Sequence, residues 1–295
     1  MIRQFSLIAV LLLFSSCSEM MNRQPELVLT DEFKDYWYSG KAEITSYHLE
    51  QARYGEIREG EAVLIYVTED LLPDQQVKAN SITSGGISSL KLNSTKKFLT
   101  GIYPYSIMQS SFYPLDGKPH AIKVSASIQE WCGQTYMQLN NRGDFDIVTH
   151  SYFEGEADTY IKINKVNLEN EIWNRLRVQY SDLPVGNFKM IPSFEYLRLT
   201  HQKVEPHIAT GEYYTNNHLN VYELNYPDLK RNLKIYFDRS FPYSVEKWEE
   251  TYPSGTGNDA ITLTTRAVKK QLLRTDYWNR NSNKDLPLRN KLDLD

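Results

Sequence analysis

The stretch 121–130, AIKVSASIQE, decides the fold. Apolar residues fill every second position from Ile122 to Ile128, with lysine, serine and glutamine near and between them. Because successive side chains of a strand point to opposite faces, this alternation places one face in a core and the other in water. A half-buried strand of this kind is typical of an antiparallel sheet.

The segments around this strand predict hairpins. Residues 105–115 are rich in aromatic side chains and are separated from the strand by Asp116-Gly117, a pair suited to the positive φ of a tight turn. Two further hairpins are expected, 41–52 with 62–68 across Glu59-Gly60, and 135–139 with 145–152 across 140–143. Other strands are expected at 194–200, 207–214, 219–226, 232–237, 243–252 and 260–272. So many short strands predict an all-β body that is mainly antiparallel.

One central helix is expected near 168–181. Asn167 is placed to cap it, and Leu168, Ile172 and Leu176 recur at four-residue spacing until Pro184 ends the segment. The helix segment, 167–183, then separates a first β-rich half, 31–166, from a second, 184–278. Residues 279–295 form a polar tail, which we expect to fray.

An internal repeat links the two halves. Tyr-Pro-Tyr-Ser-Ile at 103–107 is matched by Phe-Pro-Tyr-Ser-Val at 241–245, and Tyr113-Pro114 is matched by Tyr252-Pro253. The register between the copies nearly holds, since 121–124 also resembles 260–263. This predicts a duplicated β-meander that forms curved sheets or a half-barrel. The alternative is a chance likeness between two aromatic hairpins.

The N-terminus has the build of an export signal. Arg3 is followed by an apolar run, 5–14, that is too short to span a bilayer, where about 20 residues are needed. Ser15-Ser16-Cys17 then resembles the lipobox of bacterial lipoproteins. The resemblance implies that residues 1–16 are a signal peptide and that Cys17 receives acyl chains such as palmitate. Residues 17–30 are then the lipidated cysteine and a tether, because the stretch after Cys17 is largely polar and lacks periodicity. A soluble secreted protein and an uncleaved anchor are the alternatives.

Charge and cysteine usage narrow the partners further. The net charge of −4 comes without a cluster of basic residues, so we expect no nucleic acid as a partner. The chain has 2 cysteines. If Cys17 carries lipid, Cys132 has no partner for a disulfide. Because Cys132 follows Trp131 in a strand-like stretch, we expect it to be buried in the core and to resist thiol reagents.

The chain lacks the common catalytic signatures. There is no Gly-x4-Gly-Lys-Ser/Thr loop, no Gly-x-Ser-x-Gly elbow and no His-Glu-x2-His motif. His201, Glu205 and His207 could in principle face a zinc ion, but Pro206 breaks a helix there, so we predict no metal site and no cofactor. Adjacent acids such as Glu249-Glu250 point to opposite faces of a strand, so no catalytic residue is assigned.

Aromatic residues are the unusual feature, with 21 tyrosines in the chain. A tyrosine ring offers apolar area with a polar tip. Tyr103, Tyr105, Trp131, Tyr243 and Trp248 are therefore candidates to line a groove for a glycan or an amphiphile. The alternative is that tyrosine is simply common in strands.

Four segments resemble a group of uncharacterised lipoproteins from Bacteroidota. They are 41–47, KAEITSY; 51–56, QARYGE; 100–106, TGIYPYS; and 129–134, QEWCGQ. Members are often labelled "septum formation inhibitor Maf". The phosphate loop of Maf pyrophosphatases, Ser-x-Ser-Pro-Arg-Arg, is absent from this chain. The resemblance therefore implies an envelope location and leaves the activity open. With one acidic residue in 18–21, we expect an outer-membrane lipoprotein that faces the periplasm.

These observations favour a noncatalytic binding or scaffold domain, held at a membrane through its acyl chains, for an envelope protein or an amphiphilic lipid or glycan ligand. The alternative is a hydrolase of envelope glycan whose carboxylates cannot be identified from the sequence. Convergent carboxylates with raised pKa in a cleft would favour the enzyme, and an aromatic concavity without them would favour binding.

Overall fold

The computed structural model describes residues 27–81, 85–255 and 257–294. In these residues the chain forms one large, mostly antiparallel sheet with a few short helices, as the alternating patterns predicted. The predicted signal peptide, Cys17 and most of the tether lie outside the described residues. Among the helices that are described, none is both long and apolar enough to cross a membrane.

The strands follow one another along most of the sheet, in the order β10-β11-β12-β13-β14-β15-β16-β1-β2-β4-β5-β6-β7-β8-β9, with β3 paired to β2. Their bounds are β1 Ala42–Arg53, β2 Glu56–Leu72, β3 Val77–Lys78, β4 Ile87–Thr100, β5 Tyr103–Pro114, β6 Lys123–Glu130, β7 Gly133–Asn141, β8 Phe145–His150, β9 Thr159–Ile163, β10 Asn167–Leu168, β11 Gly186–Ile191, β12 His207–Asn216, β13 Leu219–Tyr226, β14 Arg231–Asp238, β15 Val245–Ser254 and β16 Ile261–Thr275. Pairing of β16 with β1 joins the two meanders, and over the described strands the sheet stays open between β9 and β10.

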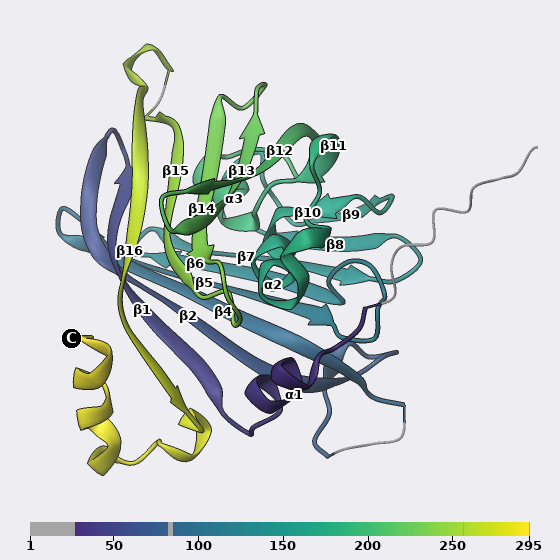
Figure 1. Cartoon of the computed structure of the whole chain (residues 1–295). Coiled ribbons are helices and arrows are strands. Elements are labelled where there is room, and N and C mark those ends of the chain that lie inside the picture. The colour runs from purple at the N-terminus through teal and green to yellow at the C-terminus, as the bar shows by residue number, and fades with distance from the viewer. Residues whose placement is uncertain (1–26, 82–84, 256, 295) are drawn as a thin grey trace, which may run out of the picture.

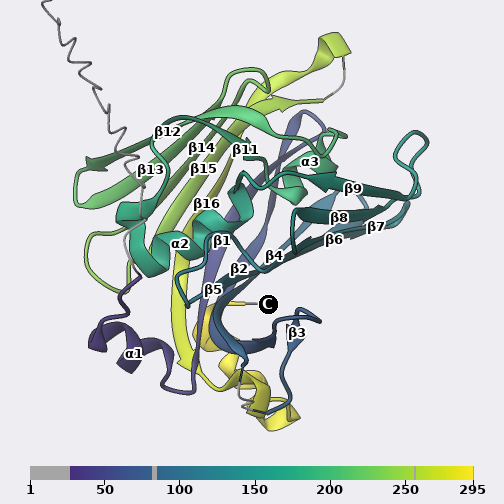
Figure 2. The ribbon, with the colours of Figure 1, turned by 90° about the vertical axis from the view of Figure 1, so that its right-hand side faces the viewer.

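The sheet is strongly curved and holds two helices on its concave side (Figures 1 and 2). These are α2, Glu169–Gln179, which continues into a 3₁₀ turn at Tyr180–Asp182, and α3, Phe194–Leu199. A third helix, α1, spans Asp31–Trp37 and packs against β2, where Trp37 contacts Tyr66. The main core fills the space between the concave face and α2. It contains residues from both meanders, so one core joins them.

The segment that decided the fold behaves as predicted. Val124, Ala126 and Ile128 are at most 2% exposed, and β6 pairs with β5 in antiparallel register. The connection between β5 and β6 is not the tight turn that was predicted, because Asp116-Gly117 lies in a longer loop, 115–122. The β1–β2 turn is also displaced, to Tyr54-Gly55, where both residues have positive φ. Gly60 instead lies inside β2, where a Cβ would stand 2.2 Å from the Lys97 carbonyl oxygen of β4.

The predicted helix is α2, although its cap is different. Ile172 and Leu176 are fully buried against the sheet. The N-cap is Leu168, whose backbone N–H donates to the Glu171 carboxylate over 3.4 Å. Asn167, which we expected to cap the helix, instead accepts a hydrogen bond from Arg175 at 3.2 Å.

Two helices differ from the sequence prediction: α3 lies where a strand was expected, and α1 lies where no element was expected. The expected strand at 194–200 is α3, because the Ser193 hydroxyl caps it by accepting from the Tyr196 N–H at 3.2 Å. Helix α1 was not predicted at all, although Thr30 caps it in the same way and Phe33 and Trp37 bury one face. Each helix is short, so its apolar spacing alone did not reveal it.

The C-terminal tail was wrongly expected to fray. It forms 3₁₀ helices at Tyr277–Asn279, Asn283–Leu288 and Asn290–Leu292. Leu292, 7% exposed, packs with Ala42 and Ile44 on the convex face of β1 (Figure 1). Leucines of the tail thus pack against apolar side chains of the sheet. The polar stretch before them gave no sign of this contact.

The two copies of the sequence repeat adopt different local structures. The first copy begins β5, whereas Phe241–Ser244 of the second lies in the loop before β15 and Tyr243 has a φ of 57°. Both halves are meanders of one sheet. The later matches do correspond, because Tyr113-Pro114 and Tyr252-Pro253 lie near the ends of β5 and β15, and 121–124 and 260–263 span the starts of β6 and β16.

Candidate functional site

Four arginines of the described chain are buried, Arg53, Arg177, Arg198 and Arg231. A buried charge is stable only with a partner, so the partner of each arginine indicates what its surroundings are built for. Two of the four pair with carboxylates in the middle of the molecule. The other two lie at one end of the sheet, and their partners are neutral.

The first pairing is part of a group that we call the interior network, Lys96, Glu169, Glu195, Arg231 and Glu250. Arg231 donates to both carboxylate oxygens of Glu169, at 2.5 and 2.6 Å, and through Nε to Glu250 at 2.7 Å. Lys96 donates to Glu195 at 2.6 Å. The network therefore joins β4, β14 and β15 to α2 and α3 through bonds between opposite charges.

A small cavity of about 40 Å³ lies inside the interior network, between α2 and the sheet. Trp173 and Trp248 stand at its edge, with ring centroids 5.4 Å apart. The Ser111 hydroxyl, which also lines the cavity, has no hydrogen-bond partner among the described residues. This volume holds a few water molecules, at roughly 10–15 Å³ each, and cannot hold a sugar ring.

Burial raises the pKa of Glu195, Lys96 opposes this rise, and Glu250 adds to it. Glu195 also accepts a hydrogen bond from Gln109 at 2.9 Å. Three glutamates therefore converge here, and one has a raised pKa. That pattern is typical of acid-base catalysis, but also of a structural ion-pair network.

The second pairing clamps α2 to β1. Arg177 donates to both oxygens of Glu43, at 2.8 and 2.7 Å, and its guanidinium lies over the Tyr66 ring at 4.6 Å. Burial raises the pKa of Glu43, but Arg177 and a hydrogen bond from Tyr36 outweigh it, so the pKa is lowered. With both charges almost fully buried and matched, this pair has the character of a structural clamp.

The remaining two arginines lie where several turns meet. The β1–β2, β4–β5, β6–β7 and β15–β16 turns are at the same end of the sheet, which we call the tip (Figure 1). Exposed apolar side chains gather there: Ile102 is 83% exposed, Trp131 69% and Tyr54 49%. The opposite end, the base, contains the β5–β6 loop, and Leu27 at the start of the described chain lies against Gly117 of that loop.

Arg53, the last residue of β1, is 8% exposed and has only neutral acceptors. It donates to the Leu199 carbonyl at 2.6 Å, to the Tyr105 hydroxyl at 3.0 Å and to the Tyr54 hydroxyl at 3.1 Å. Its guanidinium also lies 4.1 Å from the centre of the Tyr54 ring. Among the described residues, Nε of Arg53 has no hydrogen-bond partner.

Arg198, in the last turn of α3, is similar. It is 6% exposed, donates through Nε to Thr135 at 3.1 Å and lies 4.0 Å from the centre of the Phe153 ring. Its Nη1 has no partner in the part of the chain that is described. Burial lowers the pKa of Arg198; Glu156 opposes this and Arg53 adds to it, which places the two cations close enough to repel each other.

A pocket of about 420 Å³ opens beside Arg53, and we call it the tip pocket. Its volume lies within the range of roughly 300–1,000 Å³ that is usual for small-molecule sites. Its walls include Arg53, Tyr54, Tyr196, Leu199, His201 and Tyr252. No aspartate or glutamate is among the described residues that line it. The tip pocket is thus aromatic with a cationic wall.

The structure distributes the five predicted aromatic residues over three places. Tyr103, Tyr105 and Trp131 share the tip, with ring centroids 6.0 Å apart for the first pair and 6.4 Å for Tyr103 and Trp131. Trp248 lies at the interior cavity, and Tyr243 packs on Tyr180 near the base. The five do not form one groove.

Cys132 is exposed, so the expectation of a buried thiol was wrong. Trp131 and Cys132 form the two-residue turn between β6 and β7 and do not continue the strand. The Cys132 N–H donates to Glu130 at 2.6 Å, and a side-chain hydrogen bond with Glu130 raises the pKa of the thiol. Cys132 is therefore an accessible thiol at the tip, held mainly in its protonated form.

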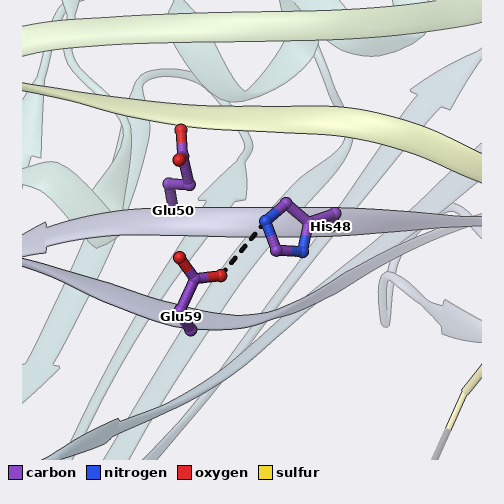
Figure 3. A group of neighbouring side chains, drawn as sticks. All are labelled: His48, Glu50 and Glu59. Carbon is purple, nitrogen blue, oxygen red and sulfur yellow. Dashed lines mark ion pairs between the residues drawn. The ribbon is translucent and has the colours of Figure 1, made fainter.

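The histidines do not form the zinc site that the sequence spacing could have allowed. His201 pairs with Glu156, and His207 pairs with Asp228 at 2.6 Å. On the convex face, His48, Glu50 and Glu59 bring one ligand atom each to within 4.8 Å of the others (Figure 3). His48 already bonds Glu59 at 3.1 Å, and the side chains of both are more than half exposed.

Neither Arg53 nor Arg198 is among the site residues predicted from the sequence. Arg53 could have been found, because it lies at even spacing from Tyr47 and Leu49, which face the core. Arg198 could not, because the alternation of its segment predicts a strand and the segment forms α3. Comparisons with family models, with curated proteins and with solved structures gave no match. The proposed function therefore rests on the sequence and on the geometry of these sites.

Proposed function

We propose that the protein is an outer-membrane lipoprotein, anchored through Cys17 and facing the periplasm, whose sheet is a noncatalytic domain that binds an amphiphilic ligand in the tip pocket. The pocket's size and its aromatic walls carry this proposal. Exposed Ile102 and Trp131 beside the tip add apolar surface for the rest of such a ligand.

The position of the tip fits an anchored binding protein. The described chain begins at the base, and β5, of 12 residues, runs from the tip to the base. At roughly 3.3 Å per residue this strand is about 40 Å long, and its length separates the tip from the end where the tether enters. A short lipidated tether would then leave the pocket free to meet its ligand.

The anchor is tested by Cys17→Ala. We expect this variant to lose labelling by a fatty-acid analogue and to move from the membrane fraction to the soluble fraction, because two or three acyl chains are what hold a lipoprotein stably. Cys132→Ala is the matched control and should change neither result. Membrane retention of Cys17→Ala would refute the anchor.

Ligand binding is tested by filling the pocket. Full-length protein purified from envelopes is analysed by native mass spectrometry for a bound small molecule. Thr200 lines the tip pocket, so Thr200→Trp should lose that molecule, while Thr215→Trp, exposed near the end of β12 and away from the pocket, should keep it. Absence of a bound molecule in the wild type, or equal retention by both variants, would contradict the proposal. A bound protein in place of a small molecule would favour the scaffold alternative.

A second function, hydrolysis of envelope glycan, is favoured by the three convergent glutamates of the interior network and the raised pKa of Glu195. The cavity of about 40 Å³ counts against it. Release of soluble fragments from purified peptidoglycan by the wild type, with loss of that activity in Glu195→Gln, would establish the enzyme. The binding proposal expects no release by either protein.

A further inference from the structure

The partners of the four buried arginines divide them into two kinds. Arg177 and Arg231 each donate two hydrogen bonds to one carboxylate. Arg53 and Arg198 form no ion pair with any described carboxylate, and each keeps one N–H without an acceptor. A buried cation without a counter-ion is unfavourable by several kcal/mol, and Arg53 in particular is hydrogen-bonded only to neutral groups of the described chain.

The acids near the tip pocket offset part of the charge of Arg198, since Glu156 raises the pKa of Arg198 and Arg198 lowers the pKa of Glu130. Of the nearby acids, Glu156 bonds His201 and Ser151, and Glu130 bonds the Cys132 N–H and the Tyr152 hydroxyl. Burial lowers the pKa of Arg53, but Tyr105 and Tyr54 raise it by more, so the guanidinium stays charged. The acceptors of Arg53 are two phenols and a backbone carbonyl, all neutral.

We propose that the ligand of the tip pocket carries an oxyanion, a phosphate or a carboxylate, that binds against Arg53, with Arg198 adding to the positive potential. Guanidinium groups bind such oxyanions through directed, charge-assisted hydrogen bonds. This inference rests on the proposed function, because it specifies the ligand of the same pocket.

The rings beside Arg53 favour an oxyanion that is attached to a larger body. Tyr54, Tyr196 and Tyr252 give the pocket flat apolar walls with polar tips, and the volume of about 420 Å³ exceeds what a free ion fills. An acidic sugar fits this chemistry, and so does the headgroup of an anionic lipid. Both present an oxyanion together with hydroxyl groups and a carbon framework.

Binding of chosen probes to the full-length protein in detergent tests the inference. Glucuronate, inorganic phosphate and glucose are titrated calorimetrically. We expect glucuronate to bind at least about tenfold more tightly than glucose, since a hydrogen bond to a charged group contributes that much, and we expect salt to weaken it. Vesicles of phosphatidylglycerol and of phosphatidylcholine are compared by flotation. Preference for the anionic vesicles would identify a lipid source, and binding of the small probes alone would identify a soluble one.

Variants connect the binding to Arg53. Arg53→Gln removes the charge but keeps donors and should weaken oxyanion binding at least about tenfold, while Arg53→Lys should retain part of it. Arg266→Gln, on the convex face with its side chain 53% exposed, is the matched control and should bind like the wild type. If Arg53→Gln does not fold by circular dichroism, Arg198→Gln replaces it, with a smaller expected loss.

Two outcomes overturn the inference. One is equal affinity for glucuronate and glucose together with no preference for anionic vesicles. The other is oxyanion binding that Arg53→Gln leaves unchanged. If Thr200→Trp loses a copurified molecule that proves to be neutral, the proposed function stands and this inference fails. If the wild type carries no molecule and binds none of the probes, both fail.

Discussion

Arg231 in the interior network and Arg53 at the tip are both buried on the concave side of one sheet, yet their surroundings differ. Arg231 meets two carboxylates, whereas Arg53 meets phenols and a carbonyl. Carboxylates of the interior network balance the positive charge of Arg231, whereas Arg53 is hydrogen-bonded only to neutral groups. The difference separates charge that holds a fold together from charge that is available to a ligand.

The largest expected effect is on stability. Arg231→Met leaves Glu169 and Glu250 buried without a counter-ion, so we expect a loss of about 3–5 kcal/mol in the free energy of unfolding. Arg53→Met leaves no charge behind and should lose less, about 1–2 kcal/mol. Urea unfolding followed by tryptophan fluorescence measures both. An equal loss of unfolding free energy in the two variants would mean that pairing with carboxylates does not distinguish Arg231 from Arg53.

The pH dependence of stability should differ between two buried glutamates, Glu43 and Glu195. The pKa of Glu43 is lowered, so its pairing stabilises the fold above its ordinary pKa of about 4.5 and is lost as the pH falls below it. The pKa of Glu195 is raised, so its contribution is present at or below pH 4.5 and is lost as the pH rises through the raised value.

Glu43→Gln and Glu195→Gln should therefore respond to pH in opposite directions. Relative to the wild type, Glu43→Gln becomes less stable as the pH rises to about 4.5, and Glu195→Gln becomes more stable as the pH rises above 4.5. Urea unfolding at several pH values measures both slopes. Slopes of the same sign would mean that Lys96 balances Glu195 as fully as Arg177 balances Glu43.

The smallest effect concerns the thiol at the tip. Cys132 should react with a maleimide in the native state, because it is exposed. Glu130→Gln should speed the reaction several-fold near neutral pH, since the Glu130 carboxylate raises the thiol pKa. Glu154→Gln, an exposed acid in a nearby loop, is the control. If Cys132 does not react in the native state, the thiol is buried, as the sequence predicted, and its exposure in the structure is wrong.

Much of the fold could be predicted from the sequence, because strand alternation and the Leu168–Ile172–Leu176 spacing are local patterns. The tip could not. The burial of Arg53 depends on α3, whose end provides the Leu199 carbonyl, and α3 was expected to be a strand. The interior glutamates belong to segments far apart in the chain, so their convergence follows from the curvature of the sheet and not from spacing.

The seam between β1 and β16 has a consequence for how the chain matures. The Ser46 hydroxyl accepts a bond from the Gln271 N–H, 225 residues later, so β1 has one unpaired edge until the last strand is made. An unpaired edge is a template for association with other chains. A chain that stops before β16 would present that edge permanently. Pairing with β16 closes the edge, and Leu292 then covers Ile44 on the face of the same strand.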